Sequence, residues 1–401
     1  MRKIVYWLTL VLIFMIPWEG VVEFAGLGTA ARLMGLVVGA CWLVMVASTG
    51  RLRRPGAFVV ATSIFVLWNA ITVLWSPDPL QSMRHVWTWV QCLGLVFILW
   101  DLYRTRAAIL AGLQAYVLGV YVAIAGAVLN YFASDPFYSY YQRFSPGKVT
   151  NPDGFGFIVA LGIPVACYLA SSSGTTHLRR TLRLVNLAYV PAAFLGLALS
   201  GTRTAAIAGV IGLAFGLASL TRLSLPARVA VLVLLTCAVY FLLPVVVPLR
   251  SFERLGTTAT ELTQGDLNGR LGQWQQGLLA FSENPIVGVG TNMYRTVNDL
   301  GKLAHNSFLS VLVELGLIGF ALFGVILAIV VNAALVQPKW DRRFWLTVLL
   351  VWTIGSSTLT WEYRKTTWLF LPLVVASAAI ASRRDDDPQA EPVLPRVGRS
   401  T

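Results

Sequence analysis

The sequence predicts an all-α membrane protein with about 12 transmembrane helices. Hydrophobic residues make up 57% of the 401-residue chain, charged residues make up only 12%, and the mean hydropathy is +0.70. Such a chain has too little polar surface to cover a water-soluble globule. Its apolar runs are about twenty residues long and apolar on all sides, which disfavours the alternating strands of a membrane barrel.

The expected spans are the apolar runs between clusters of charged residues. In order they are 4–18, 26–47, 57–75, 85–100, 107–132, 154–171, 184–200, 204–220, 228–249, 303–332, 343–361 and 366–382. The first follows Arg2 and Lys3 and resembles a signal peptide, but it has no small-residue cleavage site, so we interpret it as a retained span. All four cysteines fall inside these runs, where no disulfide is expected.

Basic residues set the expected orientation. Every second connection is short and basic, as in Arg51 to Arg54 and Lys339 to Arg343. By the positive-inside rule, these connections and both termini lie in the cytoplasm. The chain is therefore expected to divide into residues 1–249 with nine spans, a helical periplasmic subdomain at 250–302, residues 303–382 with three spans, and a disordered cytoplasmic tail at 383–401.

The external connections carry more cations than the positive-inside rule predicts. They hold Arg84, Arg143, Lys148, Arg203, Arg250, Arg254, Arg270, Arg295, Lys302, Arg364 and Lys365. An anionic ligand explains this excess, although contact with membrane lipid head groups explains Arg84, Lys302 and Lys365 equally well. Arg203 lies between two apolar runs with almost no loop, where a guanidinium is costly and where its paired donors fit phosphate oxygens.

Two further motifs lie closer to the C-terminus. Arg270 opens an expected external helix, and a Pro- and Gly-rich turn from Asn284 to Gly290 follows that helix. His305 stands at the outer mouth of a long apolar helix, where an imidazole can exchange protons near neutral pH. Glu314 is nine residues further on, on the opposite side of that helix, and we interpret it as a packing or hydrogen-bonding residue.

Metal chemistry has no support in the sequence. The chain has three histidines and no paired external carboxylates at ligand spacing. No divalent-cation site is therefore expected.

Together these motifs resemble the O-antigen ligase and polymerase superfamily. The resemblance rests on Ser200-Gly201-Thr202-Arg203, on Gly269-Arg270 with Asn284 to Gly290, and on His305-Asn306-Ser307-Phe308-Leu309 with Glu314-Leu315-Gly316 and Gly319. The order and spacing of the motifs agree with that family. The segment from Arg143 to Pro152 is also similar to an earlier external motif of the family, except that Asp153 stands where Asn is expected.

The resemblance implies a metal-independent, inverting glycosyltransferase that acts on the periplasmic face of a Gram-negative inner membrane. The donor would be a glycan on undecaprenyl diphosphate and the acceptor the lipid A core oligosaccharide, with no cofactor and no nucleic acid as partner. Arg203 and Arg270 would bind the donor diphosphate as catalytic residues, and His305 would be the general base. Arg143, Lys148 and Asn306 would be further substrate-binding residues.

Other functions fit parts of the sequence. A polymerase or a protein-glycosylating member of the same superfamily would use the same three groups, but the single modest external domain favours a ligase. A transporter or flippase also has about 12 spans, yet it usually carries ionisable residues near the bilayer midplane. Here the ionisable residues are concentrated at the external surface of the membrane. A noncatalytic scaffold for envelope assembly would leave the outer arginines and His305 without a role.

Overall fold

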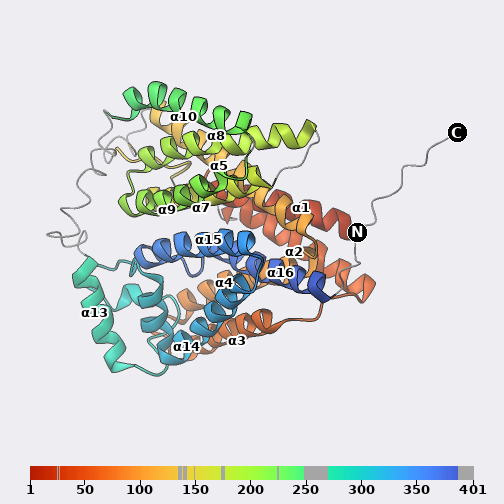
Figure 1. The fold of residues 1–401 in the computed structure, drawn as a ribbon. Helices are drawn as coiled ribbons and strands as arrows, with labels where there is room; N and C mark the ends of the chain where they lie inside the picture. Colours follow the sequence, from red (N-terminus) through yellow and green to blue (C-terminus); the bar gives the residue numbers. More distant parts are fainter. Residues whose placement is uncertain are drawn as a thin grey trace.

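The computed structural model of the chain describes residues 1–24, 26, 28–133, 138, 142–148, 150–172, 177–223, 225–247 and 270–386. Helices form nearly all of the regular structure in these residues (Figure 1). The only sheet among them is a two-stranded antiparallel hairpin of β1 (Glu23–Phe24) and β2 (Gly28–Thr29). The N-terminus lies at one end of the helical bundle and α13 at the other (Figure 1).

The helices of the described residues follow in chain order. They are α1 (Arg2–Met15), η1 (Ile16–Trp18), α2 (Ala30–Thr49), α3 (Ala57–Ile71), η2 (Thr72–Trp75), α4 (Pro79–Leu102), α5 (Arg106–Phe132), α7 (Pro152–Ser171), α8 (His177–Ser200), α9 (Arg203–Leu220), α10 (Leu225–Val246), α13 (Arg270–Glu283), η3 (Tyr294–Thr296), α14 (Ser307–Leu335), α15 (Lys339–Thr358) and α16 (Lys365–Asp386).

The all-α fold class agrees with the sequence prediction. Each expected span coincides with one of the long helices in the described residues, and nine helices there are long and apolar enough to cross a membrane. Helix α1, with 14 residues, is short for a span, and α15 begins with a charged turn. The total of about 12 spans and their orientation stay predictions.

Parts of the expected subdomain and tail lie outside the described residues. The subdomain at 250–302 is described from Arg270 onward, so its first part, with Arg250 and Arg254, is not covered. Of the tail at 383–401, the first residues continue α16 to Asp386, and 387–401 lie outside the description.

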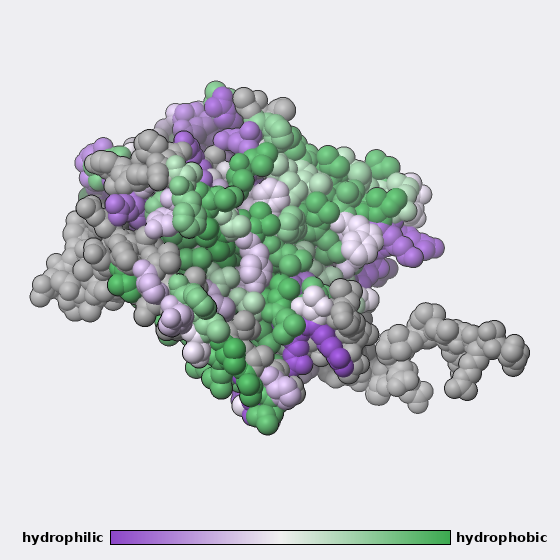
Figure 2. Space-filling model, turned by 90° about the horizontal axis from the view of Figure 1, so that it is seen from above, coloured by the Kyte–Doolittle hydropathy of each residue, from purple (hydrophilic) through white to green (hydrophobic). Residues whose placement is uncertain are grey.

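Helix α7 forms the centre of the bundle. Every residue from Phe155 to Ala170 is buried, because α5, α8, α9 and α15 pack around this helix. Glycines allow the closest approaches: a Cβ at Gly162 would lie 1.9 Å from the Tyr189 hydroxyl of α8. The surface of the bundle is the reverse of a soluble protein, with hydrophobic residues over most of one face and hydrophilic patches near its margins (Figure 2).

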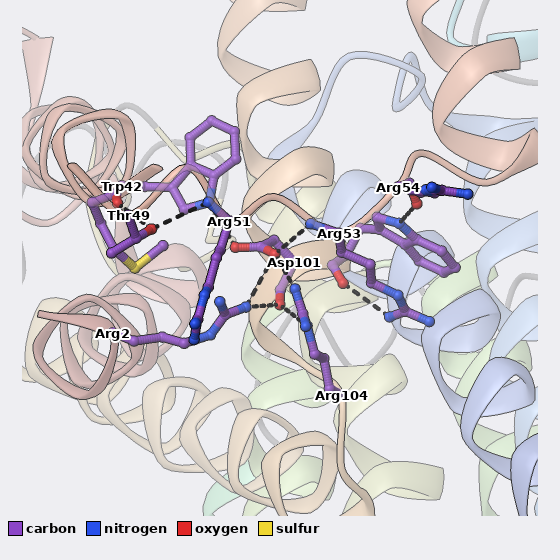
Figure 3. Close-up of polar contacts among 10 residues, drawn as sticks. Arg2, Trp42, Thr49, Arg51, Arg53, Arg54, Asp101 and Arg104 are labelled. Atoms are coloured by element: carbon purple, nitrogen blue, oxygen red, sulfur yellow. Dashed lines mark hydrogen bonds and ion pairs between the residues drawn. The ribbon is translucent and has the colours of Figure 1, made fainter. Parts of the chain in front are cut away.

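Buried carboxylates join helices at the connections expected to be cytoplasmic. Asp341, at the start of α15, accepts hydrogen bonds from the Arg106 guanidinium of α5 at 2.7 and 3.1 Å and from the Tyr168 hydroxyl of α7 at 2.6 Å. Asp101, at the end of α4, is the centre of a larger arginine cluster (Figure 3). Each carboxylate is paired with a cation, which offsets the cost of its burial.

Candidate active site

A break in α14 determines how the external helix α13 is attached. Gly316, inside α14, has φ +65° and ψ −168°, so the regular helical hydrogen bonds stop there. The Pro- and Gly-rich loop after α13 fills this break with backbone hydrogen bonds of 2.9 to 3.0 Å, from Val289 N to Val313 O, from Gly290 N to Glu314 O and from Leu317 N to Pro285 O. The loop and the broken helix therefore form one rigid unit.

Two glycines make this docking possible. A Cβ at Gly288 would lie 2.4 Å from the carbonyl oxygen of Glu314, and a Cβ at Gly316 would lie 2.3 Å from that of Ile286. Both glycines also have positive φ, which other residues rarely adopt. The glycines of the two motifs thus serve the attachment of α13 to α14.

The carboxylate of Glu314 completes the attachment. It is buried, and its oxygens accept hydrogen bonds from the backbone N–H groups of Asn292 at 2.7 Å and Tyr294 at 3.1 Å. The sequence-based interpretation of Glu314 as a hydrogen-bonding residue is confirmed.

Helix α13 is described from Arg270 onward, and a tryptophan ties it to the chain before His305. The Trp274 Nε1–H donates a hydrogen bond of 2.8 Å to the carbonyl oxygen of Ala304. His305 has φ +48°, and its backbone N–H donates to the Thr360 hydroxyl at 3.1 Å. These contacts hold the segment that carries the imidazole next to the helix that begins with Arg270.

Asn306 has a structural role in this arrangement. Its side-chain oxygen accepts hydrogen bonds from the backbone N–H groups of Phe308 at 3.0 Å and Leu309 at 3.1 Å, so it is the N-cap of α14. The cap fixes where α14 begins and therefore where His305 lies.

A second group of polar residues comes from the connections before α7 and α9. Arg143 donates from Nε to the carbonyl oxygen of Ser200 at 2.9 Å, from Nη2 to the Thr202 hydroxyl at 3.0 Å, and from Nη2 to the Asp153 carboxylate. Thr202 also donates to Asp153 at 3.1 Å. Three segments far apart in sequence are thereby locked together at one end of α7 and α9.

The two groups act on each other electrostatically. Burial lowers the pKa of Arg270, the nearby charge of Asp153 opposes that change, and the charge of Arg143 adds to it. Burial also lowers the pKa of His305 below its usual range, the charge of Arg270 lowers it further, and Asp153 opposes both effects. The fold therefore brings Arg143, Asp153, Arg270 and His305 into one electrostatic group.

Two other residues expected at the site lie at its edge. Arg203 is the first residue of α9 and directly follows Thr202, whose hydroxyl belongs to the Arg143 and Asp153 group. Lys148 is exposed in the connection between α5 and α7.

A cavity of about 720 Å³ opens beside His305. Its polar end includes His305, Asn151, Thr360 and Arg364, and Glu19 and Lys365, which also line it, form an ion pair. Its other end runs between α1, α2 and α4 and is lined mainly by apolar residues, among them Leu12, Leu36, Leu43, Val90, Leu95 and Ile98. The cavity thus joins a charged end to an apolar groove in the membrane-facing part of the bundle.

We predicted no role for Glu362, which lies close to the charged end of the cavity. Its side chain is buried, and within the described residues one carboxylate oxygen has no hydrogen-bond partner. Burial raises its pKa to about 7, while hydrogen bonds from Ser307 and Ser310 oppose that change. Its position two residues before Arg364 in sequence gave no signal of this burial. In the described part of the chain, no group of three or more His, Cys, Asp or Glu side chains is placed to hold a metal ion.

Comparison with known proteins shows two similarities. Residues 188–324 match a family model described as O-antigen ligase. The exopolysaccharide production protein ExoQ of Rhizobium meliloti (strain 1021) is 27% identical over 285 residues. Residues 188–324, about a third of the chain, are therefore similar to the O-antigen ligase family.

The match to the O-antigen ligase family covers the elements that carry the candidate site. Residues 188–324 include Arg203, Arg270, His305 and the break in α14. The alignment with ExoQ covers 66% of this chain and 62% of the relative, so the chain spans less than two thirds of that protein.

Proposed function

We propose that the protein is an O-antigen ligase of the periplasmic face of a Gram-negative inner membrane. It would transfer a glycan from undecaprenyl diphosphate to the lipid A core oligosaccharide. The observation that carries this proposal is the position of His305, which lines a cavity with a charged end and an apolar groove and lies near the charge of Arg270. A donor with a diphosphate between a sugar and a polyprenyl chain has the same order of polar and apolar parts.

The arginines near His305 suit the leaving group of this reaction. When the acceptor oxygen attacks the anomeric carbon, the bond from that carbon to the diphosphate oxygen breaks, and negative charge grows on the diphosphate. Arg143 lies close enough to Arg270 for its charge to lower the pKa of Arg270, and a guanidinium group can donate two hydrogen bonds to phosphate oxygens. Arg203, next to Thr202, is the third cation that we assign to the diphosphate.

His305 is suited to accept the proton of the acceptor hydroxyl. Because its pKa is lowered by burial and by Arg270, its imidazole is neutral at pH 7 and can take a proton. The proton transfer accompanies formation of the new glycosidic bond, since a neutral imidazole is too weak a base to ionise a sugar hydroxyl beforehand. Direct displacement of this kind inverts the anomeric configuration.

The apolar groove suits the lipid part of the donor. Two glycines leave space in its wall, since a Cβ at Gly39 of α2 or at Gly94 of α4 would meet no atom within 4 Å. Apolar side chains on both sides would contact the isoprene units nearest the diphosphate. The remainder of the chain would extend into the bilayer.

A second candidate reaction differs only in the acceptor. The similarity to an exopolysaccharide production protein favours polymerisation, in which the acceptor is the glycan of a second lipid-linked molecule. The same cations and the same base serve that reaction.

The first experiment separates these reactions in cells. A deletion strain receives wild type, His305→Ala, Arg270→Ala or the control Arg343→Gln at matched membrane levels, and lipopolysaccharide is resolved on gels. For a ligase, wild type and control restore the O-antigen ladder, and the two site variants accumulate the polymerised lipid-linked glycan. Accumulation of single repeats in the site variants would instead identify a polymerase, and normal ladders in all strains would refute the proposed site.

A further inference from the structure

The Asp101 cluster lies at the opposite end of α4 from the candidate site. Helix α4 begins beside the loop after α13, where the Ser82 hydroxyl donates to the carbonyl oxygen of Thr291 at 2.7 Å. It ends at Leu102, next to Asp101, whose side chain is 0% exposed. The cluster therefore belongs to the connections expected to be cytoplasmic and takes no part in the proposed transfer.

The carboxylate of Asp101 holds two guanidinium groups in fixed positions. Its Oδ1 accepts hydrogen bonds from Nη2 of Arg2 at 3.0 Å, from Nη2 of Arg104 at 2.5 Å and from the backbone N–H of Arg53 at 3.0 Å. Its Oδ2 accepts from Trp42 Nε1 at 3.3 Å (Figure 3). The side chains of Arg2 and Arg104 are still 41% and 38% exposed, so an external anion can reach them.

The cluster has an excess of positive charge. Arg53 stacks on Trp100, with its guanidinium carbon 3.5 Å from the ring centroid. Arg51 and Arg54 are exposed on the same loop, and Figure 3 shows Arg54 pointing away from Asp101. No ion pair within the described residues engages the side chains of these two arginines. Several cations thus surround a single carboxylate, an arrangement that attracts an anion.

The surroundings of the cluster suit a lipid better than a soluble anion. Ile4 and Trp7, two and five residues after Arg2 in α1, are 62% and 65% exposed, and Val44 of α2 is 57% exposed. The ends of α1 and α2 meet here, since the Ser48 hydroxyl lies 3.8 Å from the sulfur of Met1. A phosphate at the arginines would therefore have exposed apolar side chains beside it, and an exposed Trp near a cluster of cations is typical of the membrane interface.

We propose that the Asp101 cluster binds the phosphate head group of an anionic phospholipid in the cytoplasmic leaflet. The exposed arginines bind the phosphate oxygens, and the acyl chains lie along Ile4, Trp7 and Val44. The cluster joins α1, α2 and α4, which are the helices that line the apolar groove of the large cavity. A bound lipid therefore stabilises the inner end of the groove without touching the reacting groups.

Native mass spectrometry of the full-length protein tests this proposal. Purified protein is titrated with phosphatidylglycerol or phosphatidylcholine, and bound lipid is counted for wild type and for the double variant Arg51→Gln/Arg54→Gln, which leaves the contacts of Asp101 in place. The matched control, Arg342→Gln/Arg343→Gln, removes the same charge from another expected cytoplasmic connection. Two interfacial charges, each worth about fivefold in affinity, predict roughly 30-fold weaker phosphatidylglycerol binding in the double variant.

Three outcomes overturn the proposal. Equal binding of phosphatidylcholine would show that the site does not distinguish an anionic lipid from one without net charge. Equal weakening in the control variant would assign the effect to the general charge of this face. Displacement of phosphatidylglycerol by millimolar inorganic phosphate would identify a site for a soluble anion. Equal Tm values of wild type and double variant in detergent establish that both proteins are folded.

Discussion

His305 lies among charges that alter its pKa in opposite directions. Burial and the charges of Arg270, Lys302 and Arg295 lower the pKa of the imidazole, and only Asp153 among the neighbouring charges raises it. If His305 is the base, the transfer rate is constant near neutral pH and falls as the pH drops through this lowered pKa, because the imidazole becomes protonated.

The acid limb of the pH–rate profile is the low-pH region in which the transfer rate falls. Charge substitutions near His305 should move this acid limb in predictable directions. Lys302→Gln removes a charge that lowers the pKa of His305, so the limb should move to higher pH. Asp153→Asn removes the charge that raises the pKa, so the limb should move to lower pH, with a reduced rate because Arg143 also loses its partner. The rate of glycan transfer against pH measures both, and a shift in the same direction for the two variants would contradict the assignment of the base.

The raised pKa of Glu362 predicts that the free energy of unfolding depends on pH. Its pKa is raised to about 7, so between the ordinary carboxyl pKa and pH 7 the folded state binds more protons than the unfolded state. Stability from this group is therefore present at low pH and is lost as the pH rises toward 7. Glu362→Gln should raise Tm by a few degrees at pH 8 and leave it nearly unchanged at pH 5, and thermal unfolding in detergent measures the difference. An unchanged Tm at pH 8 would show that the carboxylate is not destabilising.

The partners of single residues were the least predictable part of the site. The motifs predicted Arg143, Arg203, Arg270 and His305 as separate candidates. They did not predict that Asp153 would bind Arg143 and influence both Arg270 and His305, since that depends on how the ends of α7, α9 and α13 pack. In the same way, Trp274 could not be paired with Ala304 before the fold was known.

At the scale of elements, the helices were predictable because their signals are local. Long apolar runs and the charge clusters between them predicted the long apolar helices of the described chain, although α4 and α8 begin six and seven residues before the expected spans at 85 and 184. The break in α14 was not predicted, although Gly316 and the glycines after Asn284 were noted as motif residues. A break of this kind is stable only because the loop from Pro285 to Gly290 supplies the missing hydrogen bonds, and that loop is distant in sequence.

Because the loop from Pro285 to Gly290 packs tightly against α14, even a small substitution at Gly316 should have a large effect on stability. Gly316→Ala places a methyl group 2.3 Å from the carbonyl oxygen of Ile286 at a residue with positive φ. It should destabilise the fold by more than about 1 kcal/mol and reduce transfer, because α13 and Arg270 would lose their attachment. Gly324→Ala on the same helix is the control, since a Cβ there meets no atom within 4 Å. Tm and transfer rate measure both effects, and a Gly316 variant that matches the control would refute this role of the loop.

At the scale of the whole molecule, the apolar groove connects the lipid phase to the charged site. Gly39→Leu fills space in the groove, whereas Gly324→Leu adds the same side chain at a position outside the cavity. If the groove holds the polyprenyl chain, Gly39→Leu should raise the KM for the lipid-linked donor at least tenfold and leave Tm nearly unchanged. Equal KM values for the two variants would contradict the assignment of the groove.

Transfer by the purified protein tests the central claim most directly. The full-length chain is reconstituted in liposomes with an undecaprenyl-diphosphate-linked glycan and a lipid A core acceptor, and product is followed for wild type, His305→Ala, Arg270→Ala and the control Arg343→Gln. The account predicts transfer without added metal or nucleotide by wild type and control, with release of undecaprenyl diphosphate, and a loss of at least a hundredfold in both site variants. Transfer at the wild-type rate by His305→Ala and Arg270→Ala would show that the chemistry takes place elsewhere.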